Sequence, residues 1–162
     1  SMLELRFSLA TLLESMFRST ALTHLALRNL FAVFQTGGTF DGLVRGVEAA
    51  RSLRSLDLSV NGFNAQQMHT LLMSLCGPQL ETLAVSSSEF SPACVEALAS
   101  AFARCPALHT LVLLTIRIAQ DAIAPLFQVL AANRSLADIR VSLHRSVPSH
   151  TRSFQLPECE AL

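Results

Sequence analysis

The stretch that decides the fold is "LRSLDLSVNGFN", residues 53–64. Leucines occupy positions 53, 56 and 58, and an asparagine follows at position 61. Alternating apolar and polar residues are typical of a short strand that buries one of its faces. Taken alone, the stretch is either one amphipathic strand of an ordinary domain or one copy of a repeat, and the rest of the chain decides between the two.

The same pattern recurs along the whole chain. It returns as "LTHLAL" (22–27), "LETLAV" (80–85), "LHTLVL" (108–113) and "LADIRV" (136–141), and "MLELRF" (2–7) supplies a truncated first copy. The middle apolar residue of each copy occupies position 3, 25, 56, 83, 111 or 139, and the last three intervals are nearly equal. A recurring period of about 28 residues indicates a repeat architecture.

The segments between the copies have a helical pattern. Their apolar residues recur every three to four positions, as an amphipathic helix requires. We expect helices within residues 9–17, 64–78, 91–106 and 119–135, and a looser one around 41–51 after a Gly-Gly loop that accommodates extra residues. Ser91 is suited to cap its helix and Pro92 to its first position, whereas Gly77 and Pro78 end the helix before them.

The alternation of short strands and helices predicts a stacked α/β solenoid. One strand–helix unit cannot bury its own apolar face, but a stack of such units can. The pattern resembles the leucine-rich-repeat family, in particular its ribonuclease-inhibitor-like class. The resemblance implies a curved arc of about five to six repeats over residues 1–142, with parallel strands on the concave side and helices on the convex side. Residues 143–162 have no periodic pattern and form a tail that caps the last repeat or is disordered.

This chain departs from the family pattern at the turn after each strand. The family places an asparagine there, which satisfies backbone groups of the turn. Only Asn61 matches, and the equivalent positions hold Ser8, Leu30, Ser88, Ile116 and His144. The other turns must therefore close by other means, and the chain is a divergent member whose partner cannot be inferred from a relative.

Composition argues against several classes of function. The 162 residues carry a formal net charge of zero, which gives no electrostatic case for binding nucleic acid or an anionic membrane. No apolar run approaches the roughly 18–20 residues of a membrane-spanning helix. The four cysteines form no CxxC pair and the five histidines show no metal-ligand spacing, so we expect reduced thiols, no metal site and no cofactor. At 51% hydrophobic and only 15% charged residues, the chain needs its apolar surface covered by flanking parts of a longer protein, a homodimer or another subunit.

The residues between the motif leucines are expected to point out of the concave sheet. They include a small, smooth centre, an apolar pair and surrounding charges. We interpret this face as a shallow groove that receives an apolar peptide or helix; alternatively, these residues are merely tolerated there. The candidate partner-binding residues are Arg28, Asp57, Val112, Leu114 and Arg140.

The function that follows is non-catalytic protein–protein recognition within a larger intracellular protein, in the cytoplasm or the nucleus. Two alternatives stay open. "LMSLCGPQL" (72–80) is similar to the elongin-binding box of ubiquitin-ligase receptors, which would make the chain a substrate-recognition domain. Ran GTPase-activating proteins have similar repeats and act through residues in the turns after the strands. Arg28-Asn29 of this chain lies at such a turn, but the acidic tail and asparagine ladder of that group are absent.

Overall fold

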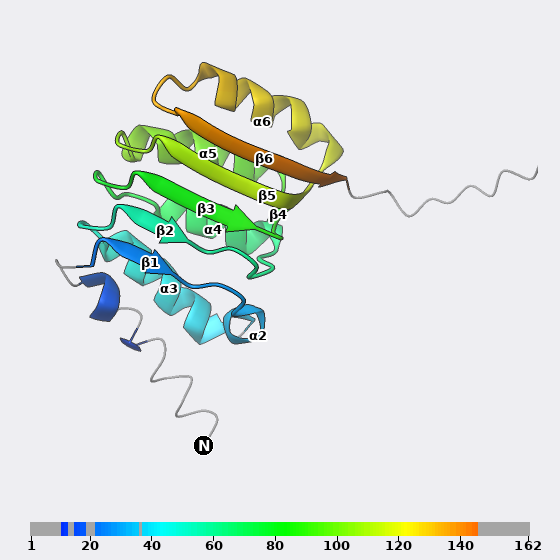
Figure 1. Cartoon of the computed structure of the whole chain (residues 1–162). Helices are drawn as coiled ribbons and strands as arrows, with labels where there is room; N and C mark the ends of the chain where they lie inside the picture. The colour runs from blue at the N-terminus through cyan, green and yellow to red at the C-terminus, as the bar shows by residue number, and fades with distance from the viewer. Residues whose placement is uncertain (1–10, 13–14, 19–21, 36, 146–162) are drawn as a thin grey trace, which may run out of the picture.

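The computed structural model describes residues 11–12, 15–18, 22–35 and 37–145. Strands β1 (His24–Ala26), β2 (Ser55–Asp57), β3 (Thr82–Ser86), β5 (Thr110–Ile118) and β6 (Asp138–Arg145) pair in parallel and in chain order. A two-residue strand, β4 (Glu89–Phe90), pairs with the second half of β5. Helices α3 (Gly37–Ala49), α4 (Ala65–Ser74), α5 (Pro92–Arg104) and α6 (Gln120–Ala132) lie on one side of the sheet, and the other side is open (Figure 1). The predicted strand–helix solenoid is confirmed.

The core is a stack of the motif residues. Leu25, Leu56, Leu83, Leu111 and Ile139 lie side by side, each paired in register with the next. The first four are at most 8% exposed, and burying each leucine contributes roughly 1.5–3 kcal/mol. Ile139 is 42% exposed because β6 is the last strand described and has a neighbour on one side only.

The helix ends follow two local signals that the sequence displays. Ser91 accepts a hydrogen bond from the backbone N–H of Cys94 and Pro92 occupies the first turn of α5, as predicted. Asn64 caps α4 through a reciprocal pair of hydrogen bonds with Gln67, which satisfies backbone N–H groups that the helix leaves free.

The carboxyl end of α4 depends on a residue from the next repeat. The helix ends at Ser74, before the predicted Gly77-Pro78 stop. The Arg104 guanidinium donates to the carbonyls of Leu72, Met73 and Leu75 at 2.8–3.1 Å. A positive charge at this end is also favoured by the helix dipole. The contact joins two repeats that are consecutive in the chain.

The Gly-Gly loop predicted in the second repeat is wrong. Gly37 and Gly38 form the first turn of α3, and the extra residues of this repeat form a short helix, α2 (Phe31–Phe34). The reason is packing. The Phe63 ring lies 5.6 Å from that of Phe34 and 5.8 Å from that of Phe40, and these contacts hold α2 and α3 in place. Burial of three aromatic rings outweighs the roughly 1 kcal/mol that each glycine costs in a helix.

The amino-terminal edge of the sheet is only partly described. Residues 15–18 are helical, and the Phe17 ring is buried against Gly46 of α3, where a Cβ atom would clash with the ring. The truncated first copy at residues 2–7 lies outside the described residues. At the other end β6 continues to Arg145, past the predicted repeat boundary at position 142, and the division of the chain into repeats and tail stays a prediction.

Candidate protein-binding face

The open face of the sheet carries the outward side chains in straight rows across the strands. The first row runs His24, Ser55, Thr82, Thr110 and Asp138. The second row runs Ala26, Asp57, Ala84, Val112 and Arg140. Both rows consist of residues that flank the motif leucines, which the sequence predicts to point out of the sheet. We call this surface the open face, and all five predicted site residues belong to it or to the strand ends beside it.

A charged pair lies at the amino-terminal side of the open face. Arg28 donates from Nε to Asp57 Oδ2 at 2.7 Å, and its Nη2 contacts the same oxygen. Asp57 Oδ1 also accepts from the backbone N–H of Ser59 at 2.9 Å. Burial alone raises the pKa of Asp57, but the hydrogen bonds from Arg28 and Ser59 and the Arg28 charge together lower that pKa below its usual value. This carboxylate is therefore ionised and held in position near neutral pH.

The centre of the open face is small and flat. Ala84 and Ser86 are 8% and 7% exposed, although they point away from the helices, because neighbouring strands crowd them. The Ser86 hydroxyl accepts a hydrogen bond from the backbone N–H of Val60 at 3.0 Å. Next to them on β5, Val112 is half-buried and Leu114 is 39% exposed. These two apolar side chains lie outside the core, whereas Leu111 and Leu113 beside them are buried.

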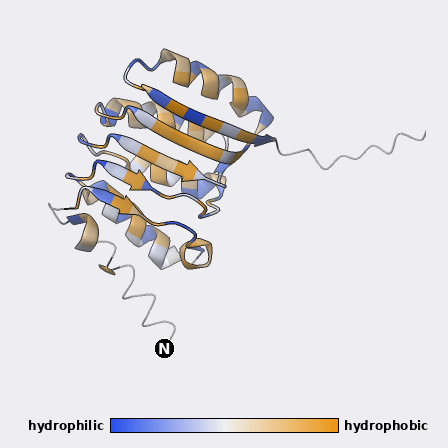
Figure 2. Cartoon of the chain, viewed as in Figure 1, coloured by the Kyte–Doolittle hydropathy of each residue, from blue (hydrophilic) through white to orange (hydrophobic). Residues whose placement is uncertain are grey.

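A second charged pair closes the face at β6. Arg140 Nη2 donates to Asp138 Oδ2 at 3.0 Å, within one strand. Both side chains are largely exposed, and such a pair contributes little to stability. Figure 2 shows the resulting contrast, with apolar strands at the centre of the sheet and hydrophilic stretches on β6. The predicted residues thus form an apolar centre with charges at two sides, but they do not converge on one point.

The turns after the strands close in two different ways. Asn61 is fully buried, donates from Nδ2 to the carbonyls of Leu27 and Leu58, and accepts at Oδ1 from the N–H of Leu30. The later repeats lack this asparagine, and the chain there continues as sheet instead, with Glu89 opposite Arg117 and Arg117 opposite His144. Ile116, at the asparagine position, is a buried strand residue. The sequence predicts that the turns without asparagine close by other means, but it does not predict that the chain continues there as sheet.

One backbone feature repeats in the described turns. Asn29, Val60, Ser87 and Thr115 each have a left-handed backbone, with φ between 55° and 61°. Each lies four positions after the middle apolar residue of its strand. At Thr115 this conformation coincides with a bulge, where Leu114 and Thr115 of β5 oppose a single residue of β6.

The described residues hold no candidate metal centre. No group of three or more His, Cys, Asp or Glu side chains gathers within them. Cys76, Cys94 and Cys105 are free thiols, and burial raises the pKa of Cys105, which favours its neutral form. No helix in this part of the chain has the length and apolarity that crossing a membrane would require.

Comparison with known proteins gives matches in structure but not in sequence. No protein-family model matches the chain, and no curated protein matches it. The C-terminal domain of tropomodulin from Caenorhabditis elegans is similar in structure, with a TM-score of 0.61 and 14% identity over 83% of this chain and 81% of that one. The actin-binding site 2 of leiomodin-1 is also similar, with a TM-score of 0.63 and 12% identity over 85% of this chain and 78% of that one. The chain therefore has the leucine-rich-repeat fold that these two domains share.

Proposed function

We propose that this chain is a non-catalytic protein-binding module of a larger intracellular protein and that its partner occupies the open face. The observation that carries the proposal is the pair Val112 and Leu114. Both side chains lie on the open face and outside the core, and Leu114 is 39% exposed on β5, which pairs with a strand on each side. An apolar centre with a polar rim is the usual anatomy of a protein interface.

The charged pairs beside this centre support a role in orienting the partner. Arg28 and Asp57 lie on one side, and Asp138 and Arg140 lie on the other. Rim charges mainly set register and association rate rather than affinity. We infer that Val112 and Leu114 contribute most of the binding energy and that Arg28, Asp57 and Arg140 fix the orientation.

Actin is the first partner to test. The leiomodin-1 domain of the same fold is an actin-binding site, and this likeness supports the choice of probe. A titration of the chain with purified actin would measure their affinity. Capture from a cell lysate, with the chain as bait, would recover other partners.

The deciding variant is Val112→Asp with Leu114→Asp. It should remain folded and lose at least ten-fold in partner affinity, a change of about 1.4 kcal/mol in the free energy of binding. The matched control is Gln128→Asp with Ala131→Asp, which adds the same charge at exposed positions of α6. Unfolding of the first variant would show that the face is assigned wrongly, and equal binding by both variants would place the partner on another surface.

Neither alternative function is favoured by a specific contact. Leu72 and Leu80 of the segment similar to an elongin-binding box are 1% and 2% exposed, so the repeat core already uses them. Arg28, at the turn that a Ran-type GTPase-activating protein would use, is engaged by Asp57. We keep the ubiquitin-ligase and GTPase-activating functions only as alternatives that the lysate experiment would reveal.

The last described repeat has apolar surface that needs cover. Phe127 of α6 is 51% exposed and Ile139 of β6 is 42% exposed. We propose that this apolar surface is covered by flanking residues of a longer protein, by a second copy of the chain or by another subunit.

A further inference from the structure

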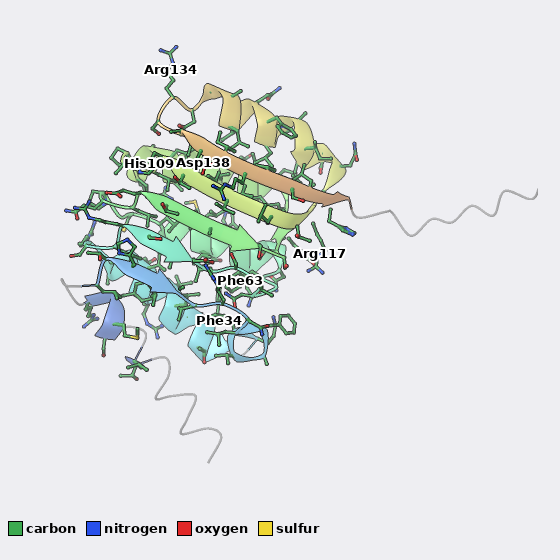
Figure 3. The ribbon with its side chains drawn as sticks, in the orientation of Figure 1. Phe34, Phe63, His109, Arg117, Arg134 and Asp138 are labelled. Atoms are coloured by element: carbon green, nitrogen blue, oxygen red, sulfur yellow. The ribbon has the colours of Figure 1, made fainter. Side chains whose placement is uncertain are left out.

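A cavity of about 340 Å³ lies beside the open face and is not among the sites predicted from the sequence. Ser87, Thr115, Arg117 and His144 line it. Its volume is at the lower end of the range of small-ligand sites. Figure 3 shows Arg117 at the end of the sheet toward which the strands run, far from His109 and Asp138 at the opposite end.

The cavity arises where β5 departs from regular pairing. Arg117 and His144 are direct neighbours across β5 and β6. The bulge at Leu114 and Thr115 interrupts the register just before them, and bulges commonly redirect side chains next to binding sites. Ser87 has the same left-handed backbone as Thr115, and its N–H is bonded to the carbonyl of Leu114 at 3.0 Å. Three neighbouring repeats thus bring the four side chains together.

All four lining side chains can donate hydrogen bonds. They offer two hydroxyls, a guanidinium and an imidazole. Thr115, Arg117 and His144 are exposed and Ser87 is half-buried, so a ligand can replace the water that their donors otherwise bind. A cavity lined by accessible donors is chemically suited to a group rich in acceptor oxygens.

Arg117 brings a positive charge to this lining, and Glu89 offsets part of that charge. Arg117 Nη2 lies 3.1 Å from Glu89 Oε1, and both side chains are about half exposed. Glu89 is on β4, on one side of β5, whereas His144 is on β6, on the other. A guanidinium has five N–H donors, so this one contact leaves others available toward β6. An exposed pair of this kind is weak, and an incoming anion can compete with it.

We propose that this cavity binds an anionic oxygen group, a carboxylate or a phosphate, carried by the peptide that occupies the open face. The identity of the ligand rests on the proposed protein-binding function. Leu114 and Arg117 are three positions apart on β5, a separation of at most about 10 Å because the bulge between them shortens the strand. The partner segment would therefore present an apolar side chain to Leu114 and an acidic or phosphorylated side chain at a similar distance along its own extended backbone.

The test is an NMR titration of the full chain with two probes, inorganic phosphate and sodium acetate. Sodium chloride of matched ionic strength serves as the blank. The expected result is saturable shifts of the Ser87 and Thr115 amides, the Arg117 Nε–H and the His144 ring. Saturation by phosphate alone would assign a phosphorylated residue as the ligand, whereas saturation by acetate as well would assign an Asp or Glu side chain.

Two variants make the result specific. Arg117→Gln should weaken probe binding at least ten-fold, and His144→Gln should weaken it about three-fold, with the far-UV spectrum unchanged. Arg134→Gln, which removes an exposed arginine of the turn between α6 and β6, should leave probe binding as it is. Shifts that stay linear with both probes, or that persist equally in Arg117→Gln, would overturn the proposal.

The titration needs no partner protein. A negative result would therefore remove the anion site and leave the protein-binding proposal intact. Conversely, if the Val112 and Leu114 variant disproves the protein-binding proposal, the titration of the unmutated chain with phosphate and acetate still tests the anion site.

Discussion

Replacing Asn61 by alanine tests how the amino-terminal repeats are joined. Its side chain is fully buried and makes three hydrogen bonds to backbone groups. Nδ2 donates to the carbonyl oxygens of Leu27 at 2.6 Å and Leu58 at 2.9 Å, and Oδ1 accepts from the N–H of Leu30 at 2.7 Å. Leu27 and Leu30 belong to one repeat and Leu58 to the next, so a single side chain satisfies the turns of both.

The expected loss of stability follows from these three bonds. Each intramolecular hydrogen bond contributes about 1 kcal/mol net, so Asn61→Ala should cost about 3 kcal/mol. The backbone groups left without partners add to this value wherever water cannot reach them. A loss of this size is a large fraction of the roughly 5–15 kcal/mol that stabilises a typical domain.

Urea unfolding followed by circular dichroism at about 222 nm is the appropriate assay, because the chain has no Trp or Tyr to report fluorescence. Asn64→Ala is the matched control. It removes the same side chain at the exposed start of α4 and should cost about 1 kcal/mol. If Asn61→Ala loses no more than the control, the turn is held by its backbone alone and the reasoning is refuted.

Three further changes test the register, the turn and the charged pair. Leu111→Asp places a charge at a position with no exposure and should abolish cooperative unfolding in the same assay; a soluble, folded variant would disprove the register. Val60→Asn should raise the free energy of unfolding by about 1 kcal/mol, since Val60 is 48% exposed and its branched side chain disfavours a φ of 61°; an unchanged midpoint would contradict this. Asp57→Asn should cost about 1 kcal/mol at pH 7. Because the pKa of Asp57 is lowered on folding, its contribution is present above the unfolded pKa and is lost as pH falls through the folded one, so variant and wild type should converge at acid pH below the folded pKa. A difference that persists there would exclude the ionic explanation.

The sequence predicts the repeat and the facing of its strands because both follow from apolar periodicity. Leu56, Leu83 and Leu111 recur at nearly constant spacing, and the structure pairs them in register. The outward rows, including Val112 and Arg140, follow automatically, since successive strand residues alternate between faces.

The features that the sequence does not predict depend on contacts between distant residues. Gly37 and Gly38 look like a loop, but the packing of Phe34 and Phe40 on Phe63 makes them helical. The continuation of β5 past the bulge requires a partner strand in the following repeat, which no local pattern reveals. The cavity beside the open face has no motif either, because its lining residues come from three separate repeats.

The unequal lengths of the strands imply that local unfolding of the solenoid begins at its amino-terminal repeats. Strands β1 and β2 have three residues each, whereas β5 and β6 have nine and eight. In a repeat protein each unit is stabilised mainly by its immediate neighbours, so local opening free energies vary along the stack. Amide protons of β1 and β2 should therefore exchange with solvent before those of β5. The Val112–Leu114 surface lies on β5, so we expect it to keep its shape when the amino-terminal repeats open.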